Sequence, residues 1–220
     1  MGARSFMLAT RIPMSRDGFD AWLRTPLPDL GVIENPSEMY TGWALDGTDP
    51  DWHLTGLAAG YPQAVAAVRA DRTRTPLDLL APRAAEGYHL IRHRDEALEV
   101  YLYDYHGEAT TTRTALLMLA GAGRFAHPGA EAPVLYWGGH AYPGLPMNID
   151  EPLAVLLVGT ARSRFVATHP FDTLIADLTP VETDFLDATA EETPTEATLS
   201  LLFDPALRDH RPGTDPLSTR

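Results

Sequence analysis

Apolar residues recur at helical spacing in three parts of the chain. They predict helices between Ser15 and Pro26, over residues 75–85, and over residues 113–125. In the first of these helices Phe19, Trp22 and Leu23 form one face, and Ser15 before them is a good N-cap. In the third helix residues 115–120 are apolar nearly all round, so we expect that helix to be buried.

Strand patterns lie between these helices. Aromatic, β-branched and other apolar residues predict strands at residues 6–14, 39–45, 88–93, 98–105, 134–137, 153–158 and 164–167. The third and fourth of these flank a polar turn at residues 94–97, so together they predict a β-hairpin. In its second strand Leu98, Val100 and Leu102 share one face, which we expect to face the core.

The mixed order of strands and helices favours an α+β fold. We expect a single domain over residues 1–187, with a mainly antiparallel sheet packed by helices and closed by the apolar segments 174–178 and 181–186. Residues 188–220 are expected to form an acidic, proline-containing, partly disordered tail that is dispensable for folding. Within that tail residues 199–203 are an apolar island, whose docking on the body the sequence leaves open.

Composition excludes several kinds of chemistry. The chain has no cysteine, and all 17 of its basic residues are arginine. The absence of lysine excludes a Schiff base, a pyridoxal phosphate anchor and a P-loop lysine. The absence of cysteine excludes a thiolate nucleophile, a disulfide and a cysteine zinc site.

Charge argues against two classes of partner. The formal net charge is −13 and the isoelectric point is about 4.9, which disfavours nucleic acid and anionic membrane surfaces. No apolar run approaches the roughly 20 residues of a membrane helix. We therefore expect a cytoplasmic protein, and the poverty in Lys, Asn and Gln suggests a GC-rich bacterial genome.

Two short segments carry candidate catalytic residues. Asp104, His106 and Glu108 alternate, so on a continuing strand they would share a face with Leu102 and could serve as an acid–base set or as ligands of a divalent metal. The plainer interpretation is a strand that ends at Tyr105 and an exposed loop after it, because an alternating acid–His–acid pattern is common by chance.

The second segment is glycine-rich. His140 is flanked by glycines after a predicted strand, and with Trp137 and Tyr142 it could line a ligand pocket. The plainer interpretation is turn chemistry alone.

Two classes of function remain. We favour a protein-binding module of immunity or antitoxin type that recognises a basic partner, with Tyr101, Tyr103 and Tyr105 on an exposed hairpin face. The alternative is a small enzyme that uses Asp104, His106 and His140, with a divalent metal or without any cofactor. Whether the two histidines meet in one cleft would separate these classes. The oligomeric state cannot be inferred from the sequence.

Overall fold

The described residues of the computed structural model are 5–35, 73–85, 89–106, 109–139, 153–166, 170–190 and 195–210. They build one six-stranded sheet of strand order β2-β3-β1-β4-β5-β6, in which every neighbouring pair is antiparallel. The strands are β1 (Ser5–Pro13), β2 (His89–Arg94), β3 (Ala97–His106), β4 (Ala132–Gly139), β5 (Leu153–Val158) and β6 (Ser163–Val166). The antiparallel α+β fold predicted from the sequence is therefore confirmed, while the predicted strand at 39–45 lies outside the described residues.

Helices and short 3-10 turns complete the fold. The α-helices are α1 (Arg16–Arg24), α4 (Pro76–Leu80), α5 (Ala109–Ala122), α6 (Phe171–Ala188), α7 (Glu196–Leu202) and α8 (Pro205–Arg208), and the 3-10 turns are η1 (Leu30–Val32), η3 (Ala81–Ala85) and η4 (Gly123–Phe125). The predicted cap of α1 is present, because the Ser15 hydroxyl accepts a hydrogen bond from the Gly18 N–H at 3.2 Å.

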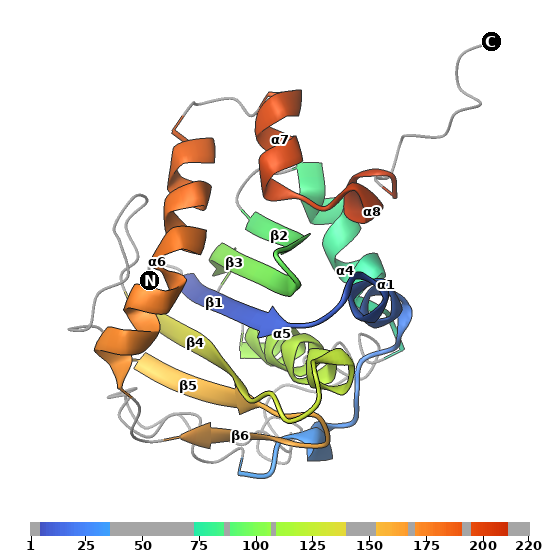
Figure 1. The fold of residues 1–220 in the computed structure, drawn as a ribbon, viewed down its shortest axis with the longest axis vertical. Coiled ribbons are helices and arrows are strands. Elements are labelled where there is room, and N and C mark those ends of the chain that lie inside the picture. Colours follow the sequence, from blue (N-terminus) through green and yellow to red (C-terminus); the bar gives the residue numbers. More distant parts are fainter. Residues whose placement is uncertain are drawn as a thin grey trace.

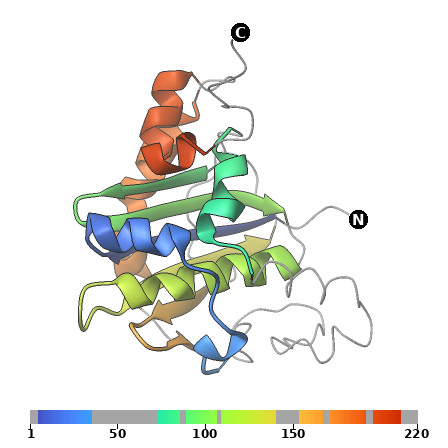
Figure 2. The same ribbon diagram turned by 90° about the vertical axis from the view of Figure 1, so that its right-hand side faces the viewer.

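Both faces of the sheet are covered. Leu98, Val100 and Leu102 are fully buried as predicted, but Tyr101 on the opposite face is fully buried too. Tyr101 stacks on Phe185 of α6, with ring centroids 4.7 Å apart. Figures 1 and 2 show α6 on one side of the strands and α1 and α5 on the other. The protein is thus a three-layer structure with the sheet in the middle.

The segment after α6 folds back onto the body. In α7 and the residues that follow, Leu202, Phe203 and Leu207 are at most 1% exposed. The apolar island of the sequence therefore docks. Because these side chains are part of the core, removal of residues 195–210 should destabilise the fold, contrary to the expectation from the sequence that residues beyond 188 are dispensable. The remaining residues of the tail lie outside the described ranges.

Segments remote in sequence occupy both edges of the sheet. At β2 the Asp204 N–H donates to the Ile91 carbonyl at 2.9 Å. At β6 the Asn35 side chain donates to the Phe165 carbonyl and accepts from the Phe165 N–H, both at 2.8 Å. Such occupation prevents edge-to-edge pairing with other chains.

No helix in the described ranges has the length and apolar character needed to cross a membrane.

The hairpin turn between β2 and β3 is strained. Asp95 and Glu96 both have positive φ, 49° and 53°. This conformation suits a two-residue hairpin, but residues with a Cβ adopt it at a cost.

We expect Glu96→Gly to raise the free energy of unfolding by about 1 kcal/mol, because glycine adopts positive φ without steric cost. Urea unfolding followed by circular dichroism measures the change. Glu96→Ala is the control, since it removes the same exposed carboxylate and keeps the Cβ. Equal effects of the two substitutions would contradict the strain argument.

Adjacent leucines of α7 provide a second test. Leu202 is fully buried and Leu201 is 59% exposed. Leu202→Ala should therefore lower the free energy of unfolding by about 2–4 kcal/mol, while Leu201→Ala should change it by less than about 0.5 kcal/mol. Similar unfolding midpoints for the two variants would show that the segment is not docked in solution.

Candidate functional site

The ends of β3 and β4 meet beside the first residue of β1. Ser5 pairs with His106 on one side and with Gly139 on the other. His106 and Gly139 are thus two strand spacings apart, roughly 10 Å. The strand runs through His106, so the interpretation of a loop after Tyr105 is corrected at that residue. The register places the described ends of β3 and β4 at the same end of the sheet.

A β-bulge changes the alternation that was predicted for the Asp104 segment. Phe6 pairs with Tyr105 but Leu8 pairs with Leu102, so two residues of β3 stand opposite one residue of β1. A one-residue shift reverses which face a register position falls on. The position of His106 therefore does not share the face of Leu102, and simple alternation fails across the bulge.

The other candidates are placed only in part. Tyr103, Asp104 and Tyr105 lie within β3 and Trp137 within β4. Three candidates, Glu108, His140 and Tyr142, lie outside the described residues. Among the residues that are described, no three His, Asp or Glu side chains gather as metal ligands.

Tyr101 is not part of an exposed binding face. Its side chain is fully buried and its hydroxyl donates to the Glu182 carboxylate of α6 at 3.0 Å. The prediction failed because alternation in β3 distinguishes the two faces but cannot show that a later helix covers the second one.

A charged network joins the hairpin to α6 and α7. Arg92 of β2 donates to Glu99 of β3 at 2.9 Å and to Asp184 of α6. Arg92 also donates to the Leu201 carbonyl of α7 at 2.9 Å. Arg94 donates to Asp184 as well, at 2.6 Å. One largely buried guanidinium therefore orients three elements, which suits its planar set of five donors.

This network alters the titration of Asp184. Burial raises the pKa of Asp184, but hydrogen bonds from Arg92 and Arg94 outweigh burial and hold the pKa below its usual range. The carboxylate is consequently ionised at neutral pH and keeps the two arginines aligned.

Two cavities flank α6 on either side of the Arg94–Asp184 contact. One, of about 340 Å³, lies between α6 and α7 and is lined by Asp184, Asp187, Ala188 and Leu201 together with both arginines. The other, of about 450 Å³, has Leu174, Leu178 and Val181 of α6 as an apolar wall, with Arg11 and Asp177 among its polar residues. α6 is thus a ridge along which both recesses lie.

The solvent side of the α6 ridge is acidic. Asp172, Asp177 and Asp187 are exposed, and α6 contains no basic residue. The sequence held the signal for this helix, because Leu174, Leu178 and Val181 repeat at helical spacing, but Pro180 split the pattern into two segments. The structure keeps Pro180 inside one helix, and its ring removes the hydrogen bond that the carbonyl four residues earlier would accept.

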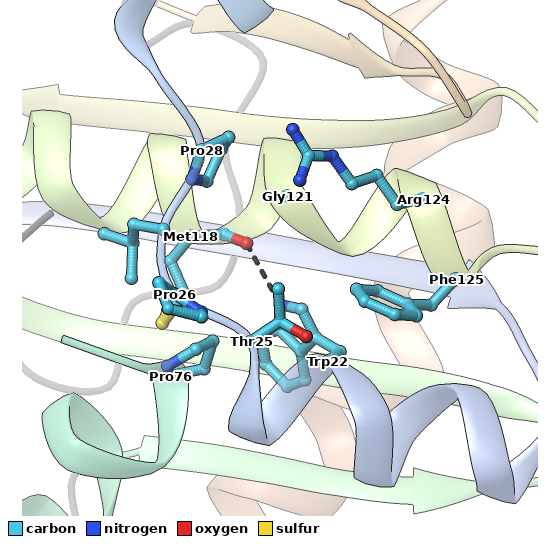
Figure 3. A pocket seen from close by; sticks show the side chains of 10 residues that line it. Trp22, Thr25, Pro26, Pro28, Pro76, Met118, Gly121, Arg124 and Phe125 are labelled. Carbon is cyan, nitrogen blue, oxygen red and sulfur yellow. Dashed lines mark hydrogen bonds between the residues drawn. The ribbon is translucent and has the colours of Figure 1, made fainter. Parts of the chain in front are cut away.

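A third recess is too small for a ligand. It lies where α1 and α4 approach α5, and Figure 3 shows Pro26, Pro28 and Pro76 around it. The Trp22 indole N–H donates to the Met118 carbonyl at 3.1 Å. The volume is about 10 Å³, which is space for one water at most. This recess is a packing feature.

Comparison with protein-family models found no match, and searches among curated proteins and among solved structures found none either. Function must therefore be argued from the site itself.

We expect Asp184→Asn to lower the free energy of unfolding by roughly 1 kcal/mol at pH 7, a value that allows for solvent screening of this half-exposed carboxylate. A depressed pKa in the folded state gives stability that is present above the unfolded pKa of about 3.9 and is lost as pH falls through the folded value. The difference between wild type and variant should therefore shrink below about pH 4.

Denaturant unfolding at pH 7 and pH 3 measures this difference. Asp187→Asn is the matched control, because Asp187 lies on the same helix and is exposed, and its carboxylate makes no hydrogen bond within the described residues. If the difference in free energy of unfolding between wild type and Asp184→Asn were the same at both pH values, the assigned role of Asp184 would be contradicted.

Proposed function

We propose that the protein is a binding module that recognises a basic protein partner through α6 and the two recesses beside it. The observation that carries this proposal is the outer face of α6, where Asp172, Asp177 and Asp187 are exposed and the helix itself contributes no basic residue. Complementary charge steers encounter and disfavours wrong partners. The net charge of −13 adds a long-range contribution of the same sign.

The shape of α6 supports docking of a partner. Between the carboxylates its exposed residues are small, namely Thr173, Ala176, Thr179, Pro180 and Thr183. Small side chains leave a flat surface and lose little rotamer entropy on contact. The opposite side of α6 is buried against the sheet, so the surface is already formed before a partner arrives.

Leu201 supplies an apolar anchor point. It is 59% exposed and lines the cavity between α6 and α7. Interfaces gain most of their binding energy from a few apolar contacts that become desolvated, with charges at the rim. A basic segment that carries one apolar side chain fits this arrangement.

The alternative function is a small enzyme that uses histidine and carboxylates. The observation in its favour is the register that brings the ends of β3 and β4 to either side of Ser5. Metal analysis of the purified protein and of a His106→Asn variant tests it. Stoichiometric metal in the wild type that is lost in the variant would put the enzyme ahead.

Neutralising α6 should weaken partner binding. Asp177→Asn/Asp187→Asn should slow association roughly tenfold at low salt, because two steering charges are lost. The control is Asp17→Asn/Glu34→Gln. It removes the same number of negative charges as the α6 variant, but from α1 and from the residues after η1. Both variants and the wild type are immobilised for capture from the native cell extract, and association rates of the captured partner are then measured against salt.

The expected partner is basic, is retained by wild type and control, and is lost from the α6 variant. Its association rate with the wild type should fall as salt rises. An acidic partner, or equal capture by all three proteins, would contradict the proposal.

A further inference from the structure

The C-terminal segment, residues 195–210, is held to the body at one buried carboxylate. Asp204 is 2% exposed. Its two oxygens accept hydrogen bonds from Arg16 of α1 at 2.6 and 2.9 Å, from the His93 N–H of β2 at 3.3 Å, and from the Ala206 N–H at 3.0 Å. One residue therefore fixes the segment to α1, to the sheet edge and to the start of α8.

The segment acts as a short extra strand. Phe203 forms a parallel bridge to Ile91, and the Asp204 N–H donates to the Ile91 carbonyl. At His93 the carboxylate of Asp204 takes the place that a strand carbonyl would occupy. Without this segment the outer edge of β2 would lose its only such partner among the described residues, and an open edge is a template for pairing with another chain.

The two helices of the segment depend on this docking. α7 has 7 residues and α8 has 4, lengths at which an isolated helix is not stable in water. Figure 1 shows α7 beside α6 and α8 beside α4, at the β2 end of the sheet. The segment therefore has no folded state of its own, and its structure is supplied by the surface that receives it.

The last turn of α6 has unfavourable electrostatics. Asp187 lies in this turn, which has no basic residue, whereas Asp184 one turn earlier is paired with Arg92 and Arg94. Two glutamates, Glu191 and Glu192, follow in the sequence. Negative charge at a helix C-terminus opposes the helix dipole. These charges therefore weaken the last turn of α6, through which the chain reaches the segment.

We propose that residues 195–210 exchange between two copies of this chain, so that the segment of each copy docks on the β2 edge and Arg16 of the other. An exchanged dimer rebuilds every contact of the segment with the body, so its cost is mainly the entropy of association. The released β2 edge and Arg16 favour this segment of a second copy over other peptides. A peptide that binds there must offer a backbone that bridges to the strand, a carboxylate for Arg16 and two apolar side chains for burial, all in the same sequence order.

Refolding at high concentration tests whether exchange occurs. Wild-type protein is unfolded in urea, refolded at millimolar and at micromolar concentration, and analysed by sedimentation velocity. A dimer that forms at the higher concentration, with the circular dichroism of the monomer, is the expected result. Only monomer at both concentrations would overturn the proposal.

A mixing experiment tests which segment is exchanged. Arg16→Asp and Asp204→Arg each place like charges at the attachment point within one chain. In a mixed dimer each body would receive a segment of opposite charge, so both attachments regain an ion pair. The mixture should hold roughly tenfold more dimer than either variant alone, as two partly exposed ion pairs predict. Native mass spectrometry with one variant isotope-labelled identifies the mixed dimer.

The chain that carries both substitutions is the folding control. It regains an opposite-charge pair within one chain. It should therefore be folded, and it should form no more dimer than the wild type at the same concentration. A folded control with no mixed dimer would overturn the proposal. If the control does not fold, the two single variants refolded separately at the same total concentration decide: a mixture that forms no more dimer than they do would overturn the proposal.

Discussion

Burial of both faces of the central strands is the constraint on which the rest of this structure depends. In β3 the successive residues Val100 and Tyr101 point to opposite faces, and both are fully buried. A sheet that is apolar on both sides needs a layer of helices on each. α5 and α1 form one layer, and α6 forms the other. Because the inner side of α6 is committed to the sheet, Asp172, Asp177 and Asp187 lie on its outside, whereas Glu182 on the inside is buried and accepts a hydrogen bond from Tyr101.

Arginine chemistry connects these layers. Arg92 reaches β3, α6 and α7 at once, which a lysine ammonium on a flexible stem could not do with the same directionality. The same contacts separate the two recesses beside α6. The feature that stabilises the hairpin against the helices is therefore also the feature that shapes the proposed binding surface.

Local patterns in the sequence predicted most of the helices and strands. The features that the sequence did not predict depend on contacts between residues far apart in the chain. The helical face of Phe19 and Trp22 and the hairpin could be predicted because neighbouring residues determine them. The burial of Tyr101 depends on Phe185, and the docking of residues 195–210 depends on an ion pair between Arg16 and Asp204, 188 positions apart. The bulge opposite Met7 has no sequence signal in β3, so the face of His106 could not be predicted by alternation.

The two edges of the sheet differ in a way that links the two proposals. At β6 the neutral side-chain amide of Asn35 pairs with both the backbone N–H and the backbone carbonyl of Phe165, as the backbone of a further strand would. At β2 closure relies on a charged pair and on a segment whose α7 also contacts Arg92. A basic partner on α6 would compete with Arg92 and Arg94 for Asp184 and so would loosen α7. By linkage, release of the segment would then favour the partner by the same free energy. On these two proposals, binding at α6 and closure of the β2 edge would therefore be coupled through Asp184.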